Sequence, residues 1–440
     1  MLPSQVRSAS LLLTAGAMIL GIGPQTPAAE SDSPDTRIRV ARLVKDLGSP
    51  SYRLREAADV ELSRLGPESR EELEKAARDD DPEIRLRARR LLKQIKISQL
   101  WKGTPIDLTV TDMSVADAVG EVVKQSGNDI AVGDQYGSFE EATITSDRGQ
   151  STFWPVVDEI CRKSGNRVRL RYGTAQPGFV LVSGELGRYP VAYAGPIRAQ
   201  ITDARRVFVE EFDYKDQSSE TTHTFQLNLL LTWENRFRIV AHQAQLALDK
   251  AVAKVPTRMV VLPGGETGWQ MAENSVRQFS SSLRLEPPPR GVARLDQLTL
   301  LWDVIAVGDM TEFALPAKPT RAAHRQDGLA VVIQEMAQTS NTRWDLTVAV
   351  SRELIVPEPE EILYLENEFE LQDAEGRPFG LHARRRLDIS NGTARIKLTY
   401  ITPTTESAPH QLVVRYPRIR DRRAIPITFH NVPLPVAHPE

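Results

Sequence analysis

The 440-residue sequence offers little that could form covalent links or bind charged polymers. It contains one cysteine, Cys161, so no disulfide can form within the chain, and the fold must depend on its apolar cores. The 55 basic and 58 acidic residues leave a net charge of −3, which argues against general affinity for nucleic acid, because such binding needs a basic face. After residue 29, no apolar run is long enough to cross a membrane.

Catalytic motifs are also missing. The sequence has no HExxH, CxxC, GxSxG or GxxxxGKS/T pattern, and its seven histidines are scattered. We therefore predict no catalytic residue, no metal ligand, no cofactor-binding residue and no cofactor, and we expect that the protein is not an enzyme. Cys161 lies beside Val157 and Ile160 on an expected apolar helix face, which favours a buried, unreactive thiol over a nucleophile.

Residues 1–29 have the pattern of an export signal. Arg7 supplies a positive start, Leu11 to Gly23 are almost wholly apolar, and the small residues of "TPAAE" offer a cleavage site. The alternative is a retained membrane anchor, but the apolar run is shorter than the roughly 20 residues that span a bilayer. We expect a cleaved signal peptide and a periplasmic or secreted protein, with no transmembrane segment after signal removal.

The remaining length predicts several domains of a multidomain α+β protein, since one small core cannot hold so many residues. We expect a short helical-repeat segment, a duplicated βαβ domain and two antiparallel β-sandwich domains. The expected ranges are 35–97 for the helical segment, 104–184 for the βαβ-βαββ domain, 186–315 for the first sandwich, 316–328 for a linker and 329–435 for the second sandwich.

The helical segment contains an internal repeat. "SPSYRLREAA" from Ser49 matches "DPEIRLRARR" from Asp81, and both residues suit helix N-caps that are followed by proline at the first helical position. Gly66 suits the end of the helix between them. This segment resembles a pair of HEAT-type helical repeats, in which Asp-Pro and the following arginine are typical.

The second repeat is "KQSGNDIAV" from Lys124 and "RKSGNRVRL" from Arg162. Each copy follows a strand and an amphipathic helix, so Gly127 and Gly165 are expected to end the helices with positive φ angles. "IDLTVTDMSVADAVGEVVKQSGNDIAV" and "TFWPVVDEICRKSGNRVRLRY" resemble the secretin and TonB short N-terminal domain. The resemblance implies a unit that docks onto neighbouring proteins or onto copies of itself and is not catalytic.

From residue 186 onward, apolar residues alternate with polar ones, as in Phe225 to Trp233, Trp344 to Val350, and Ile396 to Tyr400. A period of two residues predicts strands with one buried face, and many short strands separated by turns predict sandwiches.

Four groups of residues are candidate sites. The acidic loop around residues 210–220 suits calcium, although its spacing is not that of an EF-hand. A basic patch is one interpretation of the arginines near His382 and residues 418–423; exposed or edge-protecting strand positions are the favoured one. His242 is expected at a surface or sheet edge, not as a ligand. The large aromatics suit a sugar site or, more commonly, a core. These groups comprise Glu210, Glu211, Asp213, Asp216 and Glu220; His382, Arg384, Arg385, Arg386, Arg418, Arg420, Arg422 and Arg423; and Trp101, Trp154, Trp269, Trp302 and Tyr400.

These features together predict an exported adaptor or scaffold that binds other cell-envelope proteins through its short N-terminal-type and sandwich domains, with self-association as a further option. The alternative is a protein that binds envelope or extracellular polysaccharide through a sandwich face. Exposed aromatics on one sandwich sheet would favour the second function, and an open strand edge or apolar patch on the βαβ domain would favour the first.

Overall fold

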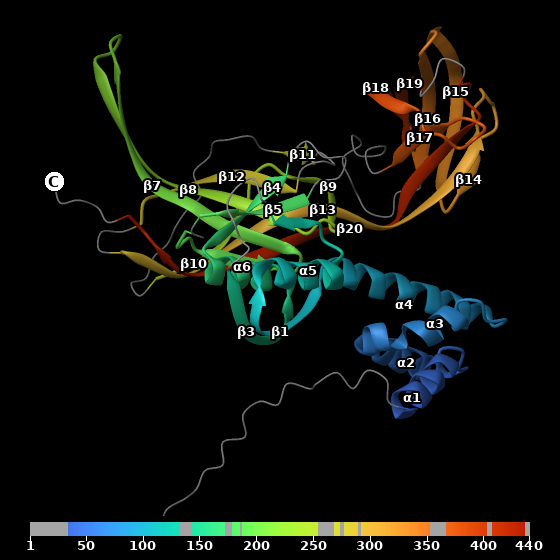
Figure 1. The fold of residues 1–440 in the computed structure, drawn as a ribbon, viewed down its shortest axis with the longest axis horizontal. Helices are drawn as coiled ribbons and strands as arrows, with labels where there is room; N and C mark the ends of the chain where they lie inside the picture. The colour runs from blue at the N-terminus through green and yellow to red at the C-terminus, as the bar shows by residue number, and fades with distance from the viewer. Residues whose placement is uncertain are drawn as a thin grey trace, which may run out of the picture. The chain divides into compact units, whose positions relative to one another are not determined.

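The structure, a computed structural model, describes residues 34–132, 142–171, 178–184, 187–253, 268–272, 277–288, 292–352, 367–402 and 407–435. The expected signal peptide lies outside these ranges. The chain is mostly β-structure, with several antiparallel sheets and few helices (Figure 1). Within the described ranges, no helix combines the length and the apolar character needed to cross a membrane. The chain divides into two compact units, Met1–Ile95 and Lys96–Glu440.

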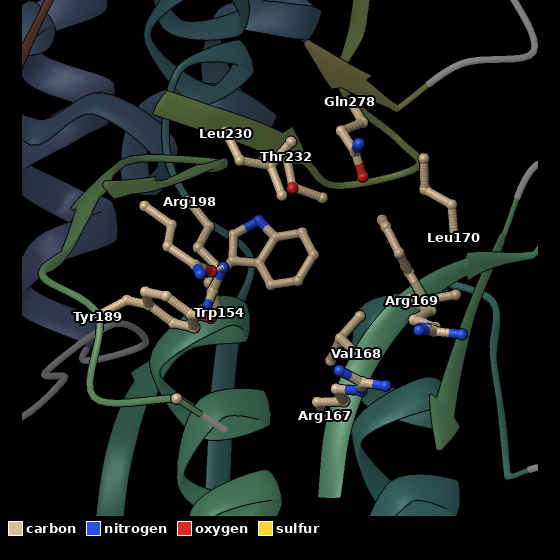
Figure 2. Close-up of a pocket in the computed structure, with 13 residues that line it drawn as sticks. Trp154, Arg167, Val168, Arg169, Leu170, Tyr189, Arg198, Leu230, Thr232 and Gln278 are labelled. Carbon is tan, nitrogen blue, oxygen red and sulfur yellow. Dashed lines mark hydrogen bonds between the residues drawn. The ribbon is translucent and has the colours of Figure 1, made fainter. Parts of the chain in front are cut away.

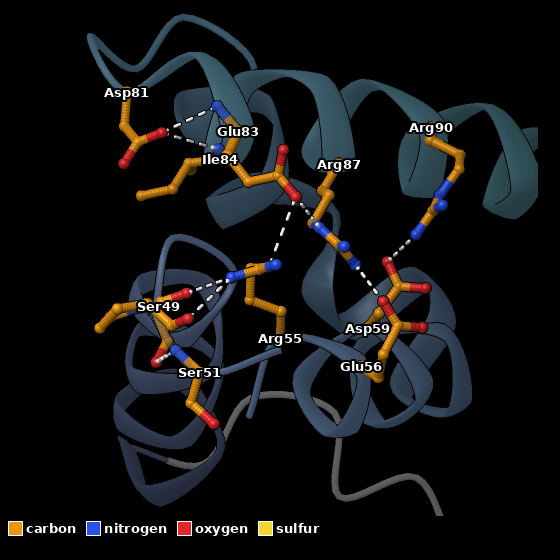
Figure 3. A network of polar contacts seen from close by, with 11 residues as sticks. Ser49, Ser51, Arg55, Glu56, Asp59, Asp81, Glu83, Ile84, Arg87 and Arg90 are labelled. Atoms are coloured by element: carbon orange, nitrogen blue, oxygen red, sulfur yellow. Dashed lines mark hydrogen bonds and ion pairs between the residues drawn. The ribbon is translucent and has the colours of Figure 1, made fainter. Parts of the chain in front are cut away.

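Helices form the first unit. They are α1 (Pro34–Asp46), α2 (Tyr52–Leu65), the 3-10 turn η1 (Gly66–Ser69), α3 (Arg70–Ala76) and α4 (Pro82–Leu100), whose residues from Lys96 on belong to the second unit. Their apolar stripes meet in one core that includes Leu62, Leu73 and Leu91. Three ion pairs join α2 to α4: Arg87 with Glu56 at 2.9 Å, Arg90 with Asp59 at 2.6 Å, and Arg55 with Glu83 at 3.5 Å (Figure 3).

One of the two expected N-caps is confirmed. The Asp81 carboxylate accepts hydrogen bonds from the backbone N–H groups of Glu83 and Ile84 at the start of α4 (Figure 3). The prediction for Ser49 was wrong, because α2 begins after Ser51. The Ser49 hydroxyl instead accepts a hydrogen bond from the Ser51 N–H in a local turn, so the helix begins later in the chain, at Tyr52. Gly66 ends α2 with a φ of 57°, as expected.

The described residues between 105 and 183 form what we call the βαβ lobe. Its elements are β1 (Pro105–Ser114), α5 (Val115–Ser126), β2 (Ile130–Val132), β3 (Thr143–Thr152), α6 (Phe153–Ser164), β4 (Asn166–Arg171) and β5 (Gly178–Ser183). β1 pairs antiparallel with β3, while a second sheet has the order β2-β5-β4. Gly127 and Gly165 end the helices with φ angles of 66° and 69°, which confirms their expected role.

Three further sheets follow the lobe. The first has the order β12-β8-β7-β6, the second has the order β11-β9-β13-β20-β17 with β10 paired to β13, and the third has the order β14-β15-β16-β19-β18. The strands of the first two are β6 (Val191–Ala194), β7 (Ile197–Asp213), β8 (Ser218–Trp233), β12 (Gln278–Leu285), β9 (Arg238–Gln243), β10 (Ala247–Val252), β11 (Trp269–Met271), β13 (Arg294–Pro316), β17 (Glu368–Gln372) and β20 (Gln411–Pro433). Those of the third are β14 (His324–Gln326), β15 (Leu329–Ser340), β16 (Arg343–Arg352), β18 (Gly380–Ser390) and β19 (Thr393–Ile401).

The long strands β13 and β20 serve two separate apolar cores. They pair with each other from Arg294 opposite Pro433 to Pro316 opposite Gln411. One part of this pair packs with the four-stranded sheet, and the other part packs with the five-stranded sheet. The expected ranges place residues 419–434 with the second sandwich, whereas Ile427 and Phe429 lie in the core that also contains Leu229. Pairing between such distant segments leaves no local mark in the sequence.

Candidate functional site

Helix α6 of the βαβ lobe lies against the outer face of the four-stranded sheet. The Trp154 indole N–H donates to the Pro196 carbonyl at 2.9 Å. One turn further along α6, Asp158 accepts from Arg198 Nε at 2.8 and 3.0 Å, and from the Tyr193 hydroxyl at 2.6 Å. Asp158 is 1% exposed and Arg198 is 7% exposed, so the ion pair is buried. Burial and the neighbouring Asp158 carboxylate raise the pKa of Tyr193, which keeps its hydroxyl protonated as a donor.

A second polar group fixes the other side of the lobe. Glu234, the residue that follows β8, is completely buried. Its carboxylate accepts hydrogen bonds from the backbone N–H and hydroxyl of Thr104 and from Arg236. Asn128 of the first Ser-Gly-Asn accepts from the Asn235 N–H at 2.7 Å. The repeated tripeptide therefore has two uses, because its first copy docks the lobe onto the sheet as well as ending a helix. The lobe and sheet form one joined surface.

A pocket of about 230 Å³ opens where the lobe meets the sheet. Figure 2 shows Arg167 to Leu170 along β4 on one side, with Leu230 and Thr232 on the strand across from them. The lining residues are Trp154, Arg167, Val168, Arg169, Leu170, Phe179, Gly187, Tyr189, Arg198, Gln200, Leu230, Thr232 and Gln278. The pocket thus combines aromatic and aliphatic walls with amide, hydroxyl and guanidinium groups, as small binding sites do.

Arg167 and Arg169 give this pocket its charge. They are exposed and lie two residues apart, so they share one face of β4, while Val168 and Leu170 pack against the lobe core. Neither arginine makes an ion pair with a residue in the described ranges. Arg198 is different, because it forms the ion pair with Asp158 and also donates a hydrogen bond to Gln200 at 2.8 Å. The two β4 arginines are therefore available for an anionic group.

The edge of β4 is open beside the pocket. Among the described strands, β4 pairs with β5 alone, and the order β2-β5-β4 leaves its other edge unpaired. An unpaired strand presents backbone N–H and C=O groups that an extended peptide can meet. An extended acidic segment would find backbone partners and guanidinium groups in the same place.

Residues 210–220 do not form the loop that would suit calcium. Glu210, Glu211, Asp213 and Glu220 belong to the paired strands β7 and β8, and Asp216 lies in the turn between them. Side chains of neighbouring strand residues point to opposite faces, so Glu210 lies on the other face from Glu211, Asp213 and Glu220, and the five carboxylates do not surround one point. Within the described ranges, no group of three or more His, Cys, Asp or Glu side chains could hold a metal ion.

The prediction for His242 was wrong, because this residue is buried. Its ring lies 4.1 Å from Phe279 and 5.3 Å from Trp302, and burial lowers its pKa. A register shift between Ile305 and Ala306 interrupts the pairing of β13 with β9. Such a bulge breaks the two-residue alternation, so His242 turns to the same side as Ile239.

The arginines that were considered as a basic patch lie in different sheets. Arg384, Arg385 and Arg386 are on β18, an edge strand of the five-stranded sheet, and the others are on β20. Arg418 pairs with Asp327 at 2.8 Å, and Arg422 pairs with Asp303 at 2.6 Å. These arginines therefore do not form a single patch, and the favoured interpretation of edge positions fits β18.

The aromatic candidates do not line a sugar site. Trp101, Trp154, Trp302 and Tyr400 are buried, and the Tyr400 hydroxyl donates to the Phe369 carbonyl at 2.9 Å. Trp269 is half-buried beneath the Arg422 guanidinium. Cys161 is completely buried, as expected, and burial raises its pKa to about 12.

Comparison with known proteins adds no identity. No family model matches the chain, and no curated protein matches it.

The pocket residues Arg167 and Arg169 were not among the candidates drawn from the sequence. Their signal was present in "RVRLRY", where arginines alternate with apolar residues on an expected strand. What the sequence could not supply is the sheet on the opposite side of the pocket, which comes from residues 198–278.

Proposed function

We propose that this chain is an exported, non-enzymatic adaptor or scaffold that binds other cell-envelope proteins. In this proposal its domains are a HEAT-type helical segment, a lobe of the secretin and TonB short N-terminal type, and two β-sandwiches that share β13 and β20. The observation that carries the proposal is the open edge of β4 beside the pocket lined by Arg167, Arg169 and Trp154.

The chemistry of this place favours an extended, acidic segment of a protein partner. Backbone groups on the β4 edge can pair with a strand of any sequence, and side-chain pockets then supply specificity. Carboxylates of the segment would meet Arg167 and Arg169, since guanidinium groups bind carboxylates in a two-pronged geometry. An apolar side chain would enter between Trp154 and Leu230. The buried Asp158–Arg198 pair keeps both walls of the pocket in place without any ligand.

The test is photocrosslinking in the envelope fraction. A photoreactive amino acid at Gln278, which lines the pocket, would be introduced into the wild-type chain and into a variant with Arg167→Glu and Arg169→Glu. A variant with Arg325→Glu supplies the control, because Arg325 is an exposed arginine of β14 outside the pocket.

The proposal expects a discrete protein crosslink that is lost on charge reversal in the pocket and kept in the control. If no protein crosslinks, and if the chain binds isolated envelope polysaccharide equally well with and without the reversal, the proposal fails in favour of the polysaccharide alternative. Fractionation of the expressed chain, with mass determination of its N-terminus, tests export and cleavage after Ala29.

A further inference from the structure

The hairpin of β7 and β8 extends beyond the sheet to which it belongs (Figure 1). Among the described strands, β6 and β12 accompany it at its base alone, where β6 reaches Gln200 and β12 reaches Phe225. From Val207 to Thr224 the described partner of each strand is the other strand of the hairpin. We call residues 207–224 the arm. A two-stranded ribbon is marginally stable by itself in water, so an arm of this kind gains stability from a partner.

One face of the arm is aromatic. Phe208 lies opposite His223 with ring centroids 4.6 Å apart, and Phe212 lies 5.0 Å from Tyr214. Phe208 is 61% exposed and Tyr214 is 88% exposed. Large apolar side chains grouped on one exposed surface mark interaction sites more often than isolated ones do.

The other face of the arm is acidic. Glu211 and Glu220 lie directly opposite each other, with Asp213 two residues along the same face. Like charges in directly opposed positions destabilise a strand pair. Neither glutamate makes an ion pair with a residue in the described ranges. A cationic partner would remove this repulsion, so the arm is complementary to a basic and partly apolar strand.

The same chain offers such a strand in β18. It is an edge strand whose described neighbour is β19, and no other described strand pairs with its outer edge. Arg385 and Arg386 are exposed on it and make no ion pair with a described residue, and Leu381 and Leu387 are exposed beside them. Arg385 lies opposite Lys397, and Lys397 has its own counter-charge in Asp345 at 2.7 Å, so Arg385 keeps its charge for another partner.

We propose that the arm of one copy docks on β18 of a second copy. In this contact the arm continues the open edge of β18, so that each face of the arm extends one face of that strand. Glu211 and Glu220 then lie on the same side as Arg385, and the aromatic face lies on the opposite side with Leu381 and Arg386. The two surfaces differ, so the contact is heterologous, and repeated contacts give a ring or an open chain of copies. The pocket at β4 takes no part, so the proposal stands or falls independently of the partner proposed above.

The test is sedimentation velocity of the chain from Glu30 onward at low and high salt. The wild-type chain is expected to form assemblies larger than a monomer at up to about 100 µM in low salt, and to lose them at about 0.5 M salt, where charges are screened over about 4 Å. One variant carries Glu211→Lys and Glu220→Lys, and another carries Arg385→Glu and Arg386→Glu. Each is expected to weaken assembly by at least about tenfold when alone.

The decisive sample is an equimolar mixture of the two variants, in which each reversed surface meets an oppositely charged one. The mixture is expected to assemble again. The control is a variant with Asp107→Lys and Asp147→Lys, on exposed residues of β1 and β3. Its net charge changes by as much as that of the Glu211 and Glu220 variant, and it should assemble like the wild type.

A variant with Phe212→Ser separates the aromatic contribution from the charges and should also assemble less. The proposal is overturned if the wild-type chain remains a monomer at every concentration. It is equally overturned if the mixture of variants fails to assemble, or if the Asp107 and Asp147 control loses assembly as the arm variant does.

Discussion

Replacing Asp158 by asparagine should loosen the βαβ lobe from the four-stranded sheet. The change keeps the shape of the side chain but removes the negative charge that faces Arg198. Arg198 is 7% exposed and would remain a buried cation without a counter-charge. Removing one partner of a buried ion pair typically costs about 3–5 kcal/mol, because the remaining charge has lost its hydration without compensation.

Cys161 gives a direct measurement of this loosening. It is the single cysteine of the chain, it is completely buried, and it follows Asp158 by about one turn on the same side of α6. A thiol reagent can reach it only when the helix opens. Since each 1.36 kcal/mol is a factor of ten, the labelling rate of Asp158→Asn should exceed that of the wild type by roughly 10²–10⁴.

Two further variants test whether the buried charge causes the faster labelling. Replacing both partners, with Asp158→Leu and Arg198→Met, leaves no buried charge and should label much more slowly than Asp158→Asn. Glu121→Gln changes an exposed pair on α5 and should label like the wild type. If Asp158→Asn labels at the wild-type rate, or if the double variant opens as readily as the single one, the ion pair does not hold the lobe in place.

Three other perturbations have defined outcomes. Burial alone would raise the pKa of Glu159, but hydrogen bonds from Lys163, Arg148 and Ser146 hold it at about 2. Its contribution to stability is therefore present above about pH 4.5 and lost as pH falls towards 2, and urea unfolding of Glu159→Gln should show a smaller loss over that range. Gly127→Ala should lower stability by about 1 kcal/mol because φ is positive, whereas Gly120→Ala in the exposed middle of α5 should raise it by about 0.5–1 kcal/mol in the same urea assay. Asp81→Ala should cost about 1 kcal/mol in thermal unfolding of the helical unit, while Ser51→Ala, at a cap without a side-chain hydrogen bond, should cost little.

Local signals in the sequence predicted local structure well. The ends of α5 and α6 at Gly127 and Gly165, the cap at Asp81 and the burial of Cys161 each depend on residues within about one helical turn. The same holds for Tyr400, whose alternation with its neighbours placed it in a core.

Features that depend on distant pairing could not be predicted. The bulge that buries His242 arises from how β9 meets β13. The pairing of residues 210–220 in a hairpin required a strand pattern where the composition suggested a loop. The pocket joins β4 to a sheet built from later residues, so its arginines were visible but their opposite wall was not. A single sequence contains no direct record of such pairings.

The sharing of β13 and β20 imposes an order on how the chain can fold during synthesis. Trp302 of β13 pairs with Ile425 of β20, which is synthesised more than a hundred residues later, so the edge of β13 that faces β20 has no partner until then. Until then β13 is a long apolar strand with an unsatisfied edge, which is the condition under which chains aggregate or recruit chaperones. A premature stop near residue 405 would remove β20 and so take one strand from both cores at once. Neither core can therefore be excised and produced as a separate fragment by cutting the chain at one point.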